Sequence, residues 1–184
     1  MILYHTGFSE IRFPDIRHGR KNADFGQGFY LSADPAFSRR WAGSRRGQDT
    51  YINTYELRTE RLAVKTFARD REWFEYISAN RNGKEDTLSG CDVIVGPIAN
   101  DTIYDLFGIT TSGFLTAEQA LKLLSAGPEY TQVTLKTDRA AEALRFLSSE
   151  IISREEIEGF RGAVKREEEA YQEQAARLMR VEDP

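Results

Sequence analysis

The segment DFGQGFYLSADPAFSRRW, residues 24–41, constrains the fold of this chain more than any other stretch. Two glycines, Gly26 and Gly28, stand on either side of Gln27, and glycine lets the backbone bend sharply or approach a ligand closely. The apolar run Phe29–Leu31 that follows predicts a short strand. An ordinary tight turn before a buried strand fits the same pattern, so these residues by themselves predict structure rather than function.

A capped helix is expected directly after this strand. Asp34 has the side chain preferred at a helix N-cap, and Pro35 suits the first helical position. We expect the helix to continue to about Gly43, which puts Ser38 and Trp41 three residues apart on one face. That face could hold a flat ligand, although an aromatic residue at such a position is also typical of a protein core.

The remaining chain predicts strands and helices that follow one another without strict alternation. This mixture is typical of the α+β class. Reciprocal capping boxes at 116–119 and 153–156 mark two helix starts. Strands are expected at residues 1–5, 29–31, 51–57, 62–67, 92–97 and 130–136, and helices at 36–43, 71–80, 102–107, 116–125, 138–147 and 153–180.

Composition indicates one globular body. A chain of 184 residues with 40% hydrophobic residues can bury one sizeable core. The net charge of −4 argues against nucleic-acid binding through bulk charge. Arg39, Arg40, Arg45 and Arg46 could still contact phosphates, or could form ordinary salt bridges. The single cysteine excludes an intramolecular disulfide.

The chain carries no apolar run of membrane-spanning length and no basic-then-apolar start. We therefore expect a cytoplasmic protein with no membrane partner, and leaderless delivery into another cell is compatible with this pattern. We expect residues 1–150 to form the main domain and residues 151–184 a charged helical extension. Its thin apolar stripe predicts partial packing on the body, with the remainder contacting a partner or a second copy, or forming a solvated tail. The stripe consists of Ile157, Phe160, Val164, Tyr171, Ala175 and Leu178.

Three segments together resemble a known superfamily. FGQGFYLSAD is similar to the FGKGIYFAD-type signature of ADP-ribosyltransferases, in the branch of poly(ADP-ribose) polymerases and diphtheria toxin. Leu3–Gly7 resembles the first strand of that superfamily, and Tyr130–Leu135 resembles the strand that carries its third catalytic residue. The segments occur in the superfamily's order. As a whole, the chain is similar to a group of small bacterial proteins that share the phrases DFGxGFYL and GPxAND.

The resemblance implies a split pair of small, mainly antiparallel sheets with flanking helices. It implies a glycosyltransferase that uses NAD as co-substrate, without a metal, and places ADP-ribose on a protein or nucleic acid. The small size and the C-terminal helix would suit a toxin or effector, for example in a toxin–antitoxin module, with an antitoxin or immunity protein as partner and a homodimer as an alternative.

The resemblance assigns catalytic roles to His5, Tyr30 and Gln132. His5 would bind the adenine-side ribose, Tyr30 would stack on the nicotinamide, and Gln132 would hold the 2′-hydroxyl of the nicotinamide ribose. The backbone at Thr6 and the hydroxyl of Ser38 would hold the carboxamide, and Trp41 would cover the second face of the ring. The expected NAD contacts are His5, Thr6, Gly7, Arg20, Gly28, Tyr30, Ser38, Trp41 and Gln132.

Gln132 stands where the best-known members of the superfamily carry glutamate. An amide keeps the hydrogen bond to a hydroxyl but brings no charge and cannot act as a base. Loss of one preorganised electrostatic contact lowers a rate by roughly 10²–10³. An inactive NAD- or ADP-ribose-binding module and an NAD glycohydrolase therefore stay open as alternatives. Glu129, Asn100 and Asp101 are further polar candidates near the expected site.

Overall fold

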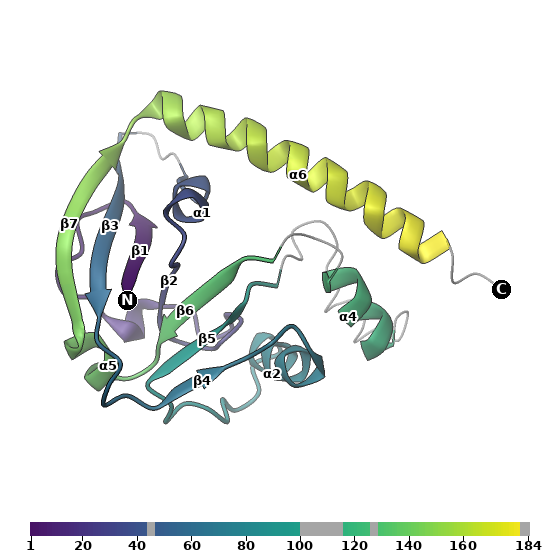
Figure 1. Cartoon of the computed structure of the whole chain (residues 1–184), viewed down its shortest axis with the longest axis horizontal. Coiled ribbons are helices and arrows are strands. Elements are labelled where there is room, and N and C mark those ends of the chain that lie inside the picture. Colours follow the sequence, from purple (N-terminus) through teal and green to yellow (C-terminus); the bar gives the residue numbers. More distant parts are fainter. Residues whose placement is uncertain (44–46, 100–115, 126–128, 181–184) are drawn as a thin grey trace.

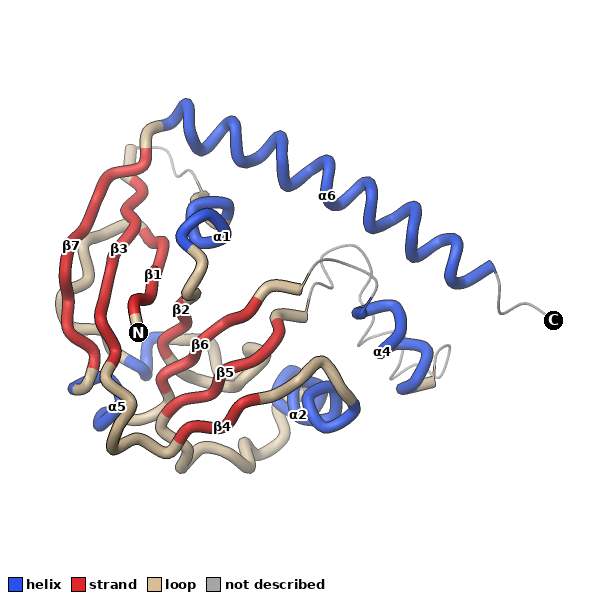
Figure 2. Tube along the Cα trace, viewed as in Figure 1, coloured by secondary structure: helices blue, strands red, loops and turns tan. Residues whose placement is uncertain are grey.

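The computed structural model describes residues 1–43, 47–99, 116–125 and 129–180. They form an α+β protein with two sheets, five α-helices and one short 3-10 helix (Figures 1 and 2). This confirms the expected class and the expected pair of mainly antiparallel sheets. The predicted helix at 102–107 and the candidates Asn100, Asp101, Arg45 and Arg46 lie outside the described residues.

The first sheet has three antiparallel strands in the order β1-β3-β7. The second sheet has the order β2-β6-β5-β4, antiparallel except for the parallel pair β4 and β5. The bounds are β1 Ile2–Gly7, β2 Phe29–Leu31, β3 Thr50–Leu57, β4 Val64–Thr66, β5 Val93–Pro97, β6 Thr131–Leu135 and β7 Leu144–Ile152.

The two sheets meet at β1 and the end of β2. Tyr4 N–H donates to the Ser32 carbonyl over 2.8 Å, and Ser32 N–H donates to the Tyr4 carbonyl over 2.9 Å. One hydrophobic cluster joins strands of both sheets. Because the sheets share this core, side chains at the β1–β2 junction have fixed positions relative to those on β6. The buried members of the cluster are Leu3, Phe29, Leu31, Tyr55, Leu57, Val93, Val133, Leu135, Ala140 and Leu144.

Three helices begin where the sequence predicts caps, at Asp34, Thr116 and Ser153. Asp34 accepts hydrogen bonds from the N–H groups of Ala36 and Phe37 at the start of α1. Thr116 and Gln119 form the predicted reciprocal pair at the start of α4. The helices are η1 Ile16–His18 (3-10), α1 Pro35–Arg40, α2 Arg71–Arg81, α4 Ala117–Ser125, α5 Asp138–Glu142 and α6 Arg154–Arg180. Among these described helices, none combines the length and the apolarity needed to cross a membrane.

Two helix predictions are wrong in extent. The helix predicted to reach Gly43 ends at Arg40, with Trp41 as its C-cap. The helix predicted over 138–147 ends at Glu142, and the chain then enters β7. Strong helix formers in residues 138–147 favour a helix locally, but pairing with β3 prevails. A register shift in that pairing also disrupts the regular alternation of apolar residues that would have marked a strand.

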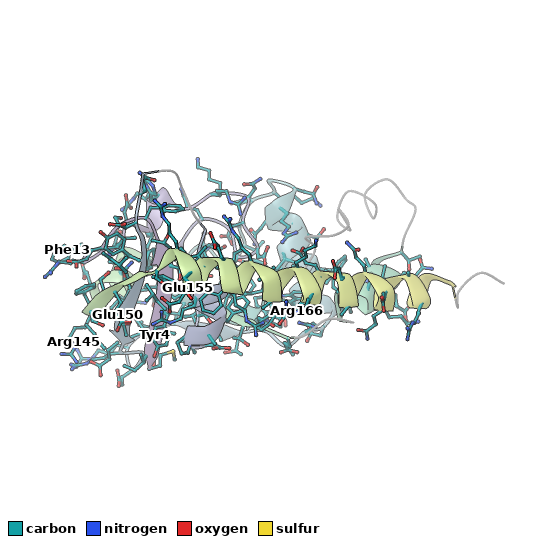
Figure 3. The ribbon with its side chains drawn as sticks, turned by 90° about the horizontal axis from the view of Figure 1, so that it is seen from above. Tyr4, Phe13, Arg145, Glu150, Glu155 and Arg166 are labelled. Carbon is teal, nitrogen blue, oxygen red and sulfur yellow. The ribbon has the colours of Figure 1, made fainter. Side chains whose placement is uncertain are left out.

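Through its apolar stripe, helix α6 contacts the body at two places along its described length. Ile157 and Phe160 join a cluster with residues of α1's end and the first sheet. Further along, the buried Tyr171 donates its hydroxyl hydrogen to the Leu123 carbonyl of α4 over 2.7 Å. Figure 3 looks down on the helix as it crosses the molecule. The apolar stripe is therefore bound to the body at both places. At positions 175 and 178 the structure describes the helical backbone and not the side chains.

Candidate functional site

A pocket of about 470 Å³ lies where β1, β2, α1 and β6 contribute side chains. Pockets for small ligands and cofactors have volumes of about 300–1,000 Å³, so this one can hold a sizeable ligand or part of a larger one. Its lining residues come from segments that are far apart in the sequence. They are Tyr4, His5, Thr6, Arg20, Ala23, Asp24, Tyr30, Leu31, Ser32, Phe37, Ser38, Trp41, Arg81, Ile98, Ala99 and Gln132.

Most of the sequence-predicted site residues line this pocket. The structure brings together His5, Thr6, Arg20, Tyr30, Ser38, Trp41 and Gln132. The two predicted glycines, Gly7 and Gly28, are not among the described residues that line it. Seven candidates from separate parts of the chain therefore converge in one hollow.

The imidazole of His5 is held on the edge of β1. Its Nδ1 lies 2.8 Å from the Tyr30 carbonyl oxygen, and its ring centroid lies 4.5 Å from that of Phe29. A carbonyl oxygen can only accept, so Nδ1 carries the hydrogen and Nε2 is left as an acceptor. Burial lowers the pKa of His5 from its ordinary value, against a smaller opposite effect of the carbonyl. The neutral ring therefore offers a hydrogen-bond acceptor to a hydroxyl of a ligand at neutral pH.

Tyr30 ties the glycine turn to β2. Its hydroxyl accepts from the Phe25 N–H over 2.9 Å and donates to the Gly26 carbonyl over 2.7 Å. Burial raises the pKa of Tyr30, so the phenol is neutral and cannot serve as a base near neutral pH. With its hydroxyl committed to the backbone, the side chain presents mainly its ring to the pocket.

Helix α1 is attached to β1 through Thr6. The Thr6 hydroxyl donates to the Ser38 carbonyl oxygen over 2.6 Å. At the helix end, Trp41 packs edge-to-face on Phe37 with ring centroids 5.9 Å apart, yet it is 65% exposed. An indole that lines a pocket and is also largely exposed stands at its mouth. Trp41 could thus close over a flat ligand without a change in the core.

The amide of Gln132 lies on the buried floor of the pocket. Its Nε2 donates to Asp24 Oδ2 over 3.1 Å and faces the Pro97 carbonyl at 3.5 Å. The other oxygen of Asp24 accepts from Arg81 Nε and Nη2 over 2.8 and 2.6 Å. Asp24 and Arg81 both line the pocket, and neither was recognised as a site residue from the sequence. The only sequence signal for Asp24 was its place at the head of the signature segment.

The glycines of the signature segment allow backbone conformations and contacts that a residue with a Cβ would strain. Gly26 has a φ of 71°, which favours glycine because a Cβ strains this conformation. A Cβ on Gly28 would lie 2.6 Å from the Leu135 carbonyl oxygen. Gly28 thus allows β2 to approach β6, and it is not among the described residues that line the pocket. Gly7 is close to the site: a Cβ there would lie 3.3 Å from His5 Nε2.

The basic residues of the first quarter of the chain have mixed surroundings. Arg20 lines the pocket, whereas Arg17 pairs with Asp138 over 2.9 and 2.5 Å. Arg39 lies 3.0 Å from Glu150, and Arg40 binds Glu167 of α6. The salt-bridge interpretation therefore holds for Arg39 and Arg40.

Of the described candidates that flank β5 and β6, some line the pocket and others do not. Glu129 is exposed, lies 3.8 Å from Arg69 and does not belong to the described lining of the pocket. Ile98 and Ala99 of the GPxAND phrase do line the pocket. In the described part of the chain, no group of three His, Cys, Asp or Glu side chains has a geometry suited to a metal ion.

The fold and this site define an α+β protein with a ligand-sized pocket at the junction of two sheets. The chain belongs to the family described as "protein of unknown function (DUF3990)", whose model matches residues 1–146. All the residues that line the pocket fall within the matched region, and α6 follows it. A comparison with curated proteins gives no match.

Proposed function

We propose that the protein is a mono-ADP-ribosyltransferase that transfers ADP-ribose from NAD to a macromolecular acceptor. The observation that carries the proposal is the convergence of His5, Tyr30 and Gln132 in one pocket. These three residues are separated widely in the sequence, and the superfamily resemblance alone assigns them to one site. The two mainly antiparallel sheets agree with the split-sheet architecture of an ADP-ribosyltransferase-like fold, which forms part of the proposal.

The chemistry follows from the properties of NAD. Nicotinamide leaves as a neutral molecule from a cationic pyridinium, so the protein chiefly has to orient the substrate and stabilise the oxocarbenium-like ribose. In the proposal, Nε2 of neutral His5 accepts from the adenine-side ribose. The rings of Tyr30 and Trp41 enclose the nicotinamide, Thr6 and Ser38 hold its carboxamide, and Arg20 neutralises the pyrophosphate.

The second candidate is a module that binds NAD or ADP-ribose without transfer. The amide at Gln132 favours it, because a carboxylate would stabilise the oxocarbenium and an amide stabilises it less. An NAD glycohydrolase differs from the transferase only in using water as the acceptor. Both alternatives use the same pocket, so an experiment has to separate the products.

The test is incubation of the protein with NAD labelled in its adenylate part, in the presence of cell lysate. A transferase gives label on protein or nucleic acid together with free nicotinamide. A glycohydrolase gives free ADP-ribose, and a binding module gives neither product. His5→Ala should abolish either activity.

His18→Ala is the matched control, because it removes the other histidine of the chain from the exposed end of η1. If the wild-type protein releases no nicotinamide and labels no macromolecule, both enzymatic interpretations are wrong.

The biological setting is part of the same proposal. We propose that the enzyme acts in the cytoplasm as a toxin or effector, with an antitoxin or immunity protein as partner. The charged face of α6 that turns away from the body would be the surface for that partner or for a second copy, and residues 151–184 would be the extension that carries it. Co-expression of a neighbouring open reading frame that restores growth would support this role.

A further inference from the structure

We propose that Asp24, held by Arg81, is a positioning residue that fixes the amide of Gln132 with its oxygen toward the ligand. The inference rests on the proposed function and deepens it, because it identifies what makes glutamine workable at this position. Asp24 is 8% exposed and its carboxylate lies in the pocket floor.

The hydrogen-bond inventory of Gln132 determines which end of the amide faces the ligand. The NH₂ group has two hydrogens, and the two acceptors near it are Asp24 Oδ2 at 3.1 Å and the Pro97 carbonyl at 3.5 Å. Turning the amide over would place its oxygen against two acceptors. The oxygen Oε1 is therefore the atom offered to a ligand, and it can accept a hydrogen bond from a sugar hydroxyl.

The carboxylate of Asp24 is surrounded by donors on both sides. Oδ1 accepts from Nε and Nη2 of Arg81, and Oδ2 accepts from the Ala99 N–H over 3.2 Å as well as from Gln132. An asparagine has one acceptor end and one donor end, so it cannot match donors on both sides. With its oxygen kept toward the charged guanidinium, its NH₂ group would face Gln132 and turn that amide over.

The same arrangement disfavours a glutamate at position 132. A carboxylate there would place one oxygen near Asp24 Oδ2, where Nε2 now lies at 3.1 Å. Two adjacent carboxylates repel each other unless they share a proton. With Asp24 in place, glutamine is the residue that can present an acceptor oxygen to the pocket at neutral pH without this conflict.

The kinetic test uses three variants and measures nicotinamide release from NAD. Asp24→Asn should lower kcat by about tenfold to a hundredfold, because the ligand would meet a donor in place of an acceptor. The double variant Asp24→Asn with Gln132→Glu should recover at least tenfold over Asp24→Asn, since a glutamate can accept from the new NH₂ group and still present an oxygen. Gln132→Glu alone should be less active than the double variant. A double variant no more active than Asp24→Asn would overturn the inference.

Asp92→Asn is the matched control. Asp92 is also buried and also binds an arginine, Arg139, through its Nε and Nη2 atoms. It also accepts a hydrogen bond from a backbone N–H, that of Ala63 at 2.7 Å. It does not line the pocket in the described structure. Asp92→Asn should lower the melting temperature and leave kcat within about twofold of the wild type. Equal loss of activity in Asp24→Asn and Asp92→Asn would show that a stability effect suffices.

A measurement without NAD separates failure of this inference from failure of the proposed function. In ¹⁵N-labelled protein, the side-chain amide hydrogens of Gln132 should exchange slowly with water. Asp24→Asn should shift both resonances and speed their exchange at least tenfold, whereas Asp92→Asn should not. Unchanged resonances in Asp24→Asn would overturn the positioning role, even in a protein that consumes NAD. If the wild type consumes no NAD but the Gln132 resonances still shift in Asp24→Asn, the proposed enzymatic function is refuted and the positioning role of Asp24 stands.

Discussion

The most informative single substitution is Tyr30→Phe, because it separates the hydroxyl of this residue from its ring. The hydroxyl makes two hydrogen bonds to the backbone of the glycine turn, from the Phe25 N–H and to the Gly26 carbonyl. The phenylalanine ring would keep the surface that faces the pocket. The variant therefore tests whether the turn is held by the tyrosine hydroxyl.

The expected magnitude follows from these two bonds. Loss of a typical hydrogen bond, here the one to the Gly26 carbonyl, costs about 1 kcal/mol, and loss of one that leaves a buried donor unpaired, here the Phe25 N–H, costs about 1–3 kcal/mol. Phe25 is fully buried, so water cannot readily replace the lost partner of its N–H. The free energy of unfolding should fall by about 2–4 kcal/mol.

Urea denaturation followed by far-ultraviolet circular dichroism measures this difference. The matched control is Tyr55→Phe, which removes a single hydrogen bond, from the buried Tyr55 hydroxyl to the Ile11 carbonyl over 2.7 Å. That variant should lose about 1–2 kcal/mol. The reasoning is refuted if Tyr30→Phe is no less stable than Tyr55→Phe.

Three further outcomes are expected. Gly28→Ala should lose about 1–3 kcal/mol of stability in thermal unfolding, because its Cβ would meet the Leu135 carbonyl oxygen at 2.6 Å, whereas Gly90→Ala, with no atom within 4 Å, should be neutral. Burial lowers the pKa of His5 below 6.5, so the unfolded state binds more protons than the folded state as the pH falls below 6.5. The melting temperature should therefore decrease as the pH is lowered below 6.5. This slope should be weaker in His5→Asn, and an equal slope would contradict it. Trp41→Ala should leave the melting temperature nearly unchanged, since the indole is 65% exposed, but should weaken NAD binding about threefold to tenfold in calorimetry. Unchanged affinity would remove Trp41 from the site.

Local signals in the sequence predicted the elements that carry the site. The cap at Asp34, the proline that follows it and the apolar run of β2 each act over a few residues, and each was found where expected. The alternation in β6 placed Gln132 on the face opposite Val133, and the structure puts Gln132 in the pocket and Val133 in the core. Short-range patterns therefore sufficed for these elements.

The missed features depend on contacts between distant residues. Asp24 meets Arg81 and Gln132 only after the sheets and α2 have packed, and no local pattern links these positions. The helix predicted over residues 138–147 overlaps the first part of β7, where pairing with β3, including a register shift, outweighs local helix propensity. The ion pairs of Arg39 and Arg40 with residues beyond position 149 are of the same kind.

The central claim is that the pocket lined by His5, Tyr30 and Gln132 binds NAD through its nicotinamide half. Titration calorimetry with NAD tests it most directly, on the wild-type protein and on His5→Ala, Tyr30→Ala and the control His18→Ala. The account predicts one binding site per chain in the wild type and in His18→Ala, weakened at least tenfold in the other two variants, with nicotinamide competing for the site. Absence of binding to the folded wild-type protein, or equal binding in all four proteins, would contradict it.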